Sequence, residues 1–344
     1  MLSETDLTLV NALQVDPRAP WSLIGRTIGI GAVTAARRWQ QLTGDGRAWM
    51  SAYPAGALAG RLALAFVQID CAPGEPLAVA AALAGDPHVP TIEYVAGPCD
   101  LLVHVVAADL ASVTEYIAHR LSRLPGVAST RTLVSAKLFS EGSRWQVRAI
   151  SPEQRDALAT RAKQAIGAPR FDELDRQLML ALGEDGRASY SAIGTRLGVS
   201  ASTARRRVEI ALGSGSIRLR CEIARSMSPA PVTMMLWVRV PPDRLESTAR
   251  SLASLPEVRM CAAISGAANL LVVAWLRVPA DAVPLESSLV TRLPWLDIVD
   301  RAVTLRSVKL MGRVLDETGR ARSQVPLDFW AATGTKAAPS PERP

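Results

Sequence analysis

The stretch that decides the fold is residues 171–210, FDELDRQLMLALGEDGRASYSAIGTRLGVSASTARRRVEI, because the chain contains a close copy of it. Residues 171–218 align without a gap on residues 2–49, at an offset of 169 positions, and this offset persists through most of the residues that follow. A period of this length indicates a duplicated structural unit, since solenoid and propeller repeats recur every few tens of residues. The sequence therefore predicts two similar halves, each with its own core.

Three short helices are predicted at the start of each half. In the second copy, apolar residues follow helical spacing as far as Leu182, Gly198 ends a second helix, and Ser200 is a typical N-cap for a third. Three short helices with a glycine-containing turn before the third indicate a helix-turn-helix. On the third helix, Ala204 and Val208 are predicted to face inward, so the polar residues between them are predicted to face outward.

The outward residues of the third helix are those expected to contact DNA. Arginine binds guanine edges and phosphates, and small hydroxyl groups permit close approach to the duplex. A run of arginines is more often a solvated surface, but its place on the third helix and its recurrence in the other half favour a DNA site. The predicted DNA-binding residues are Thr34, Arg37 and Arg38 in the first copy, and Ser200, Ser202, Thr203, Arg205, Arg206 and Arg207 in the second.

The first copy departs from this pattern at four positions. Gly31 stands where the second copy has its capping serine, Val33 and Ala36 replace an outward serine and an arginine, and Trp39 replaces Val208. Weaker and different DNA binding is therefore expected of the first copy. Trp21 and Trp39 fall on inward helical positions and are expected to be core aromatics.

After each helix-turn-helix, the predicted strands and helices follow the order βαββαβ. They are expected at 62–70, 75–84, 89–97, 100–107, 109–123 and 127–139, and again at 231–240, 243–254, 258–265, 269–276, 279–292 and 297–310. This order is typical of a ferredoxin-like sheet with both helices on one face. Because strand residues such as 270–273 are apolar on both sides, the other face is predicted to pack on a second such sheet.

The patterns together predict an α+β chain of four domains, two of each kind. Winged or three-helix helix-turn-helix domains are expected at 1–50 and 170–220, and ferredoxin-like sensing and dimerisation domains at 60–140 and 229–312. A linker is expected at 141–169 and a tail at 331–344. The linker is expected to be partly helical, because Ser151-Pro152-Glu153 is a typical helix start. The tail, rich in alanine and proline, is expected to be mobile.

Composition points to a globular protein with an anionic partner. Apolar residues make up 49% of the 344, which is ample for several cores, and the net charge of +7 favours binding to an anion without identifying it. The four cysteines lie singly, without the spacing of a metal site or a disulfide framework, so neither a metal nor a cofactor is indicated. No leader peptide and no long apolar run are present, so a cytoplasmic location without a membrane partner is expected.

Several of these motifs resemble the Lrp/AsnC family, the feast/famine transcriptional regulators, in a tandem duplicated form. The motifs of the helix-turn-helix are Phe171 to Arg176, Asp185-Gly186-Arg187, Leu197-Gly198-Val199-Ser200 and Arg206-Arg207-Val208; those of the sensing domain are Gly97-x-x-Asp100, the Leu-Pro-Gly-Val at 124–127 and the strand of Lys137. The resemblance covers nearly the whole chain, twice over.

The resemblance implies a sequence-specific DNA-binding transcriptional regulator and not an enzyme. Its partners would be double-stranded DNA and an effector such as an amino acid or another small metabolite, and the sensing domains would self-associate. The tentative effector site is the hairpin in each half, with Gly97 and Asp100 in the first and Gly266 and Asn269 in the second. The alternative is that these four are simply the residues a tight turn requires.

Two other classes of function stay open. Some tandem proteins of this architecture are sirohaem decarboxylases, which rely on histidine and arginine clusters in the sensing domain. This chain has only His88, His104 and His119, all in the first half and without a His-x-x-Arg-Arg grouping, which disfavours the enzyme. A metabolite-binding scaffold with eroded DNA binding is the third class, and the intact second copy argues against it.

Overall fold

The computed structural model describes residues 2–142, 145–162 and 171–332 of the chain. A three-helix unit is present at the start of each half, as predicted. The first consists of α1 (Glu4–Val15), α2 (Trp21–Ile28) and α3 (Ala32–Gly44), and the second of α8 (Glu173–Glu184), α9 (Tyr190–Leu197) and α10 (Ala201–Gly213). The end of the linker lies outside the described residues. So does the tail that was expected to be mobile, except for its first two residues.

The N-terminal ends of the third helices differ as the sequence predicts. The Ser200 hydroxyl caps α10 by accepting a hydrogen bond from a backbone N–H in the first turn, whereas Gly31 gives α3 no side-chain cap. The predicted inward face is confirmed as well, because Ala204 and Val208 are buried. Each third helix therefore presents its opposite face to solvent.

The strands and helices that follow have the expected order in both halves. The first half contains β2 (Ala63–Cys71), α5 (Pro76–Ala84), β3 (Thr91–Ala96), β4 (Leu101–Ala107), α6 (Leu110–Tyr116) with a π-helical turn at Ile117–Leu121, and β5 (Val127–Ser140). The second contains β7 (Val232–Arg239), α11 (Leu245–Ala253), β8 (Val258–Ile264), β9 (Leu270–Leu276), α12 (Ala282–Arg292) and β10 (Asp297–Leu310). The spatial order of the strands is β3-β4-β2-β5 in the first sheet and β8-β9-β7-β10 in the second.

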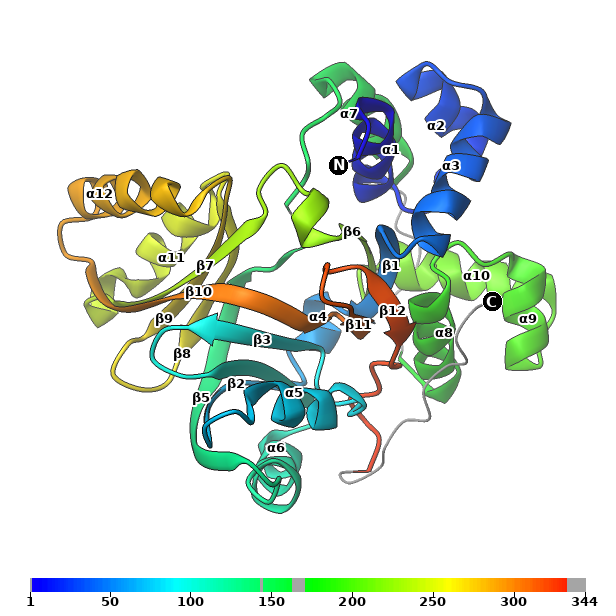
Figure 1. The fold of residues 1–344 in the computed structure, drawn as a ribbon. Helices are drawn as coiled ribbons and strands as arrows, with labels where there is room; N and C mark the ends of the chain where they lie inside the picture. The colour runs from blue at the N-terminus through cyan, green and yellow to red at the C-terminus, as the bar shows by residue number, and fades with distance from the viewer. Residues whose placement is uncertain (1, 143–144, 163–170, 333–344) are drawn as a thin grey trace.

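The two sheets join edge to edge and close into a barrel (Figure 1). Strand β5 pairs with β8, and β10 pairs with β3, both antiparallel, so the last strand of each half is bonded to the other half. Apolar residues from both halves, including Phe66, Leu102, Trp237 and Leu271, fill the space between the sheets. The second apolar face that the sequence predicted is thus covered within one chain, by the other sheet.

A two-stranded ribbon that the sequence did not predict connects the two helix-turn-helix units. Strands β1 (Ala48–Pro54) and β6 (Ile217–Ile223) pair antiparallel, with Ser51 opposite Arg220. These two residues are equivalent at the offset of 169 positions, so the pseudo-two-fold axis of the chain passes between them. All seven residues of β1 are buried. The alternation of apolar and polar residues that identifies a half-buried strand is therefore missing from its sequence.

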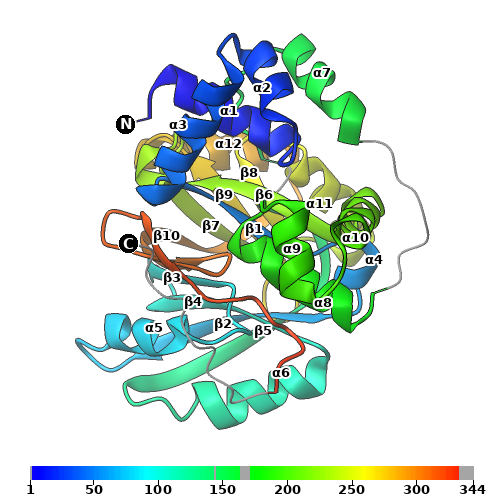
Figure 2. The same ribbon diagram turned by 90° about the vertical axis from the view of Figure 1, so that its right-hand side faces the viewer.

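Short connecting elements complete the structure. They are α4 (Gly56–Ala59), α7 (Pro152–Ala162), the 3-10 turns Arg225–Met227, Pro242–Arg244 and Pro279–Asp281, and the hairpin β11 (Arg313–Leu315) and β12 (Ala321–Gln324). Within the linker, α7 lies beside α1 and α2 (Figure 2) and buries Leu158 in their core. The hairpin extends the sheet from β10, and Arg313 donates hydrogen bonds to backbone carbonyls of α8. Among the helices of the described residues, none is long and apolar enough to cross a membrane.

Lys309 of β10 predicts a pH dependence of stability. Its side chain is fully buried, its ammonium group donates to the carbonyl oxygen of Asp86 at 2.8 Å, and burial lowers its pKa to about 7. Because the unfolded chain binds this proton more tightly than the folded protein, the free energy of unfolding increases as pH rises above 7. Relative to Lys309→Met, the wild type should gain about 1.5 kcal/mol between pH 7 and 8.5.

Urea unfolding of both proteins at four pH values in this window measures the difference. Comparing them cancels the titration of the buried cysteines, whose pKa values are raised above 9 by burial. A difference that stays constant with pH would contradict the account of Lys309.

Candidate nucleic-acid interface

Two equivalent arginines hold the helix-turn-helix units against each other. Arg18 and Arg187, which correspond at the offset of 169 positions, each donate two hydrogen bonds to the backbone of the other unit. The acceptors are the carbonyl oxygens of Gly186 and Ala188 for Arg18, at 2.7 and 2.8 Å, and those of Pro17 and Ala19 for Arg187, at 2.6 and 2.7 Å. This reciprocal exchange fixes the orientation of one unit relative to the other.

Aromatic rings stack on the same two arginines. The guanidinium of Arg187 lies 3.8 Å from the ring centre of Trp21, and that of Arg18 lies 5.0 Å from that of Tyr190. Burial and the nearby charge of Arg18 lower the pKa of Arg187 to about 10, so it is still protonated at neutral pH. Trp39 is a buried core residue as predicted, and the half-buried Trp21 packs against the same core while its ring also contacts Arg187.

The loops of the two units carry a sequence signal for this interface. An Asp-x-Arg motif recurs in the two loops, as Asp16-Pro17-Arg18 and Asp185-Gly186-Arg187. In each loop the aspartate accepts a hydrogen bond from the backbone N–H of the arginine and so holds the loop in shape. The arginine side chain is then directed at the other unit.

The outward residues of α10 lie where the sequence placed them. Ser202, Thr203, Arg205 and Arg206 are exposed, and the two hydroxyl groups lie 2.9 Å from that of Ser200. Arg205 forms an ion pair with the glutamate one turn later on the same helix. Within the described part of the chain, Arg206 makes no hydrogen bond or ion pair, so its guanidinium is available to a ligand.

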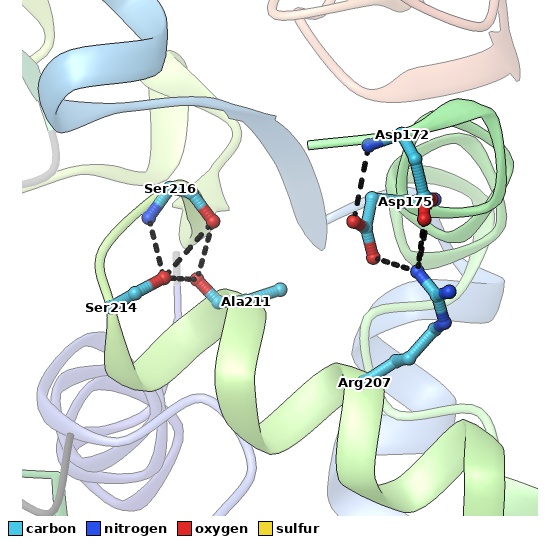
Figure 3. A network of polar contacts seen from close by, with 6 residues as sticks. All are labelled: Asp172, Asp175, Arg207, Ala211, Ser214 and Ser216. Carbon is cyan, nitrogen blue, oxygen red and sulfur yellow. Dashed lines mark hydrogen bonds and ion pairs between the residues drawn. The ribbon is translucent and has the colours of Figure 1, made fainter. Parts of the chain in front are cut away.

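Arg207 lies on a different face of α10 from its neighbours. Figure 3 shows it directed at Asp172 and Asp175 of the first helix of the unit, to which it is ion-paired at 2.9 Å in both cases. Arg38 forms the equivalent ion pair with Asp6 at 3.0 Å. These two arginines hold the third helix to the first in each unit, and their predicted contact with DNA stays a prediction.

The exposed surface of α3 is more apolar than that of α10. Val33 occupies the position equivalent to Ser202 and is 82% exposed, and Thr34 is only half-buried. Arg37 is exposed and, like Arg206, has no ion pair within the described residues. We call α3 and α10 the first and second reader helices. Each carries one unpaired arginine at the same position, beside residues that differ.

The polar side chains of the two hairpins bond the backbone of their own half. The Asp100 carboxylate accepts a hydrogen bond from the backbone N–H of Cys71 at 2.7 Å, and the Asn269 amide bonds the N–H and the carbonyl of Val240. A side chain at Gly97 would collide with β10, and Gly266 has a φ of +117°, which favours glycine. These contacts account for all four residues as turn residues.

Comparisons with known proteins point in two directions. A family model described as the AsnC-type helix-turn-helix domain matches residues 2–43 and 171–210, and one described as the Lrp/AsnC ligand binding domain matches residues 64–145. An uncharacterized HTH-type transcriptional regulator of Pyrococcus abyssi is 30% identical over 146 residues, which is 42% of this chain and 90% of that protein. Another from Pyrococcus furiosus is 36% identical over 101 residues, or 29% of this chain and 68% of that protein.

Among solved structures, the siroheme decarboxylase NirDL has a similar fold over most of its length. The TM-score is 0.54 with 15% sequence identity, over 90% of this chain and 93% of that one. A second structure of that enzyme, in complex with an iron-uroporphyrin III analogue, gives a TM-score of 0.53 at 14% identity, over 86% and 88%. At such identities the likeness concerns the fold and carries no statement about chemistry.

The reciprocal arginines predict a measurable stabilisation. Replacing Arg187 by methionine keeps most of its volume but removes two hydrogen bonds from a charged donor and leaves two carbonyls without them. We expect the free energy of unfolding to decrease by about 2–3 kcal/mol. The matched control is Arg292→Met, at an exposed position of α12, which should change it by less than about 0.5 kcal/mol. Equal losses in the two variants would show that the exchange does not stabilise the fold.

Proposed function

The chain belongs to the Lrp/AsnC family of transcriptional regulators, and from this premise we propose that it binds double-stranded DNA through both reader helices. The observation that carries the proposal is the pair of arginines Arg37 and Arg206 at equivalent positions of α3 and α10, both exposed and without a partner among the described residues. A recognition helix contacts base edges with such side chains when it enters the major groove.

Rigid placement of the reader helices supports this proposal. Helix-turn-helix dimers bind two half-sites at a spacing that the protein geometry sets. Here the same function falls to one chain, since the reciprocal bonds of Arg18 and Arg187 and the β1–β6 ribbon fix the two units relative to each other. The ion pairs of Arg38 and Arg207 in turn fix each reader helix within its unit.

The two half-sites are proposed to differ in sequence. The second reader helix offers hydroxyl groups and two exposed arginines, which suit polar base edges and phosphates. The first offers Val33, whose exposed methyl groups suit the methyl group of thymine, and a single exposed arginine. We propose that the second contributes more of the affinity, with Ser202, Thr203, Arg205 and Arg206 as its DNA contacts and Thr34 and Arg37 as those of the first.

An effector completes the proposed function. The half of the barrel at residues 64–145 matches the Lrp/AsnC ligand binding domain, and we propose that the barrel responds to a small metabolite such as an amino acid. The hairpins with Gly97, Asp100, Gly266 and Asn269 stay the sequence-based candidates for that site, although their contacts are those of turns. Self-association through the barrel is part of the same proposal.

Substituting single arginines tests the reader helices. Arg206→Ala should weaken binding to a DNA fragment selected for affinity to this protein roughly tenfold to a hundredfold, because one base contact is worth about 1–3 kcal/mol. Arg37→Ala should cause a smaller loss, and Arg292→Ala, which removes an exposed helical arginine from the barrel, should cause none. Fluorescence anisotropy at fixed salt measures all three. Wild-type affinity in Arg206→Ala would overturn the assignment.

A second candidate function is tetrapyrrole decarboxylation, which the fold of the siroheme decarboxylase NirDL suggests. The three histidines do not form a cluster. His88 contacts Tyr116 on the helix side of the sheet, His104 packs on Phe66 inside the barrel, where burial lowers its pKa to about 4, and His119 is exposed. We therefore favour the regulator.

Titration with sirohaem, the tetrapyrrole that the siroheme decarboxylase is named for, separates the two functions. For a regulator we expect neither a shifted absorption band nor loss of carboxyl groups from the tetrapyrrole. Stoichiometric uptake followed by release of carbon dioxide would establish the enzyme instead.

A further inference from the structure

A cavity of about 420 Å³ lies between the first helix-turn-helix unit, the linker and the second half of the barrel. Its walls come from α1, from the linker and the start of α7, and from the turn between α11 and β8. Pockets of this size hold small metabolites. We propose that this cavity, which we call the linker cavity, binds a small organic anion that has an apolar body.

Asn11 is the residue that most directly indicates a ligand. It is fully buried, lines the linker cavity, and accepts the backbone N–H groups of Ala149 and Ile150 through its Oδ1, at 2.7 and 3.2 Å. Its Nδ2 has no hydrogen-bond partner in the described part of the structure. An unsatisfied buried donor costs about 1–3 kcal/mol, and a ligand acceptor in the cavity would remove that cost.

The other lining groups select for negative charge. Arg148 and Arg155 line the linker cavity and are exposed to solvent, and no aspartate or glutamate is among the described residues that line it. Guanidinium groups bind carboxylates and phosphates through paired hydrogen bonds. Trp145 and the leucine, isoleucine and proline side chains of the wall provide an apolar surface, so an anion with an apolar body fits better than a bare inorganic ion.

Backbone strain occurs at the same site. Arg148 has a φ of +61°, one of two non-glycine residues with positive φ in the described chain. Such conformations cost free energy and cluster at ligand sites, where the surrounding structure maintains them. The indole of Trp145 is also held in place, edge-on to Trp275 at 4.5 Å between ring centres. The linker is thus preorganised around the cavity.

The position of Asn11 carries an apolar residue in the other half. Asn11 corresponds to Leu180 at the offset of 169 positions, and the segment after β10 lies beside Leu180. Only about 10 Å³ of space is left between them. Asn11→Leu therefore copies a side chain that the chain itself uses at this position of the fold.

A ligand here would connect the barrel to the first helix-turn-helix unit. It would touch α1 on one side and the α11–β8 turn on the other, and so add contacts between a DNA-binding unit and the sensing half that lies next to it in space. This regulatory consequence rests on the proposed function. Ligand binding itself does not, and it is measured in the absence of DNA.

The test uses the full chain and three probes, namely 4-methyl-2-oxopentanoate, phenylpyruvate and inorganic phosphate. Thermal melting and tryptophan fluorescence are followed up to 5 mM probe, since a ligand of the folded state raises the melting temperature. We expect a rise of about 2 °C or more with at least one of the two organic anions and a smaller one with phosphate. No shift with either organic anion would overturn the proposal, and so would a shift with phosphate alone.

Two variants locate the site. Asn11→Leu, which copies the second half, and Arg148→Gly, which suits a positive φ and should leave the fold intact, should each weaken probe binding about tenfold or more. Arg292→Ala is the matched control for the lost charge and should bind as the wild type does. Wild-type affinity in both site variants would overturn the proposal. DNA affinity is measured separately, so failure of the DNA-binding function remains distinguishable.

Discussion

Backbone pairing across the two halves is the constraint on which the rest of the structure depends. A four-stranded sheet with helices on one face leaves an apolar face and two unpaired edges, and unpaired edges promote aggregation. The β5–β8 and β10–β3 pairs give the edge strands their backbone hydrogen bonds, and the shared core buries the apolar faces of both sheets. Once the ring is closed, the two halves can take only one relative position. Closure of the ring thereby also determines where the β1–β6 ribbon and the helix-turn-helix units joined to it lie.

Local patterns in the sequence predicted the helices, strands and turns, because these depend on residues that are close together in the chain. Helical spacing, caps and turn residues identified both three-helix units and the βαββαβ order. The closure of the ring was not predictable, because strand pairing between residues far apart in the chain depends on geometry. The ribbon was missed because β1 is wholly buried. The predicted helix at 109–123 is shorter in the structure, since its last turn is π-helical.

The same distinction applies to the candidate site. Helical periodicity correctly placed Arg206 outward and Ala204 inward. Arg207 is one residue further along, about 100° around the helix, and meets an aspartate 32 residues away in the sequence. Only the packing of α10 on α8 could reveal that contact. Adjacent arginines of one motif therefore have separate tasks, since one builds the unit and the other remains available to a partner.

The reciprocal exchange between Arg18 and Arg187 also affects how such a chain can evolve. In a homodimer encoded by one gene, each substitution appears in both subunits, so a change at the interface removes all four hydrogen bonds at once. Here a mutation in either copy removes only two, and the other pair persists. Because the two copies lie in one chain, each can mutate independently while the assembly stays the same. Selection could then change one copy, as at Asn11 and Val33, while the other kept the molecule together.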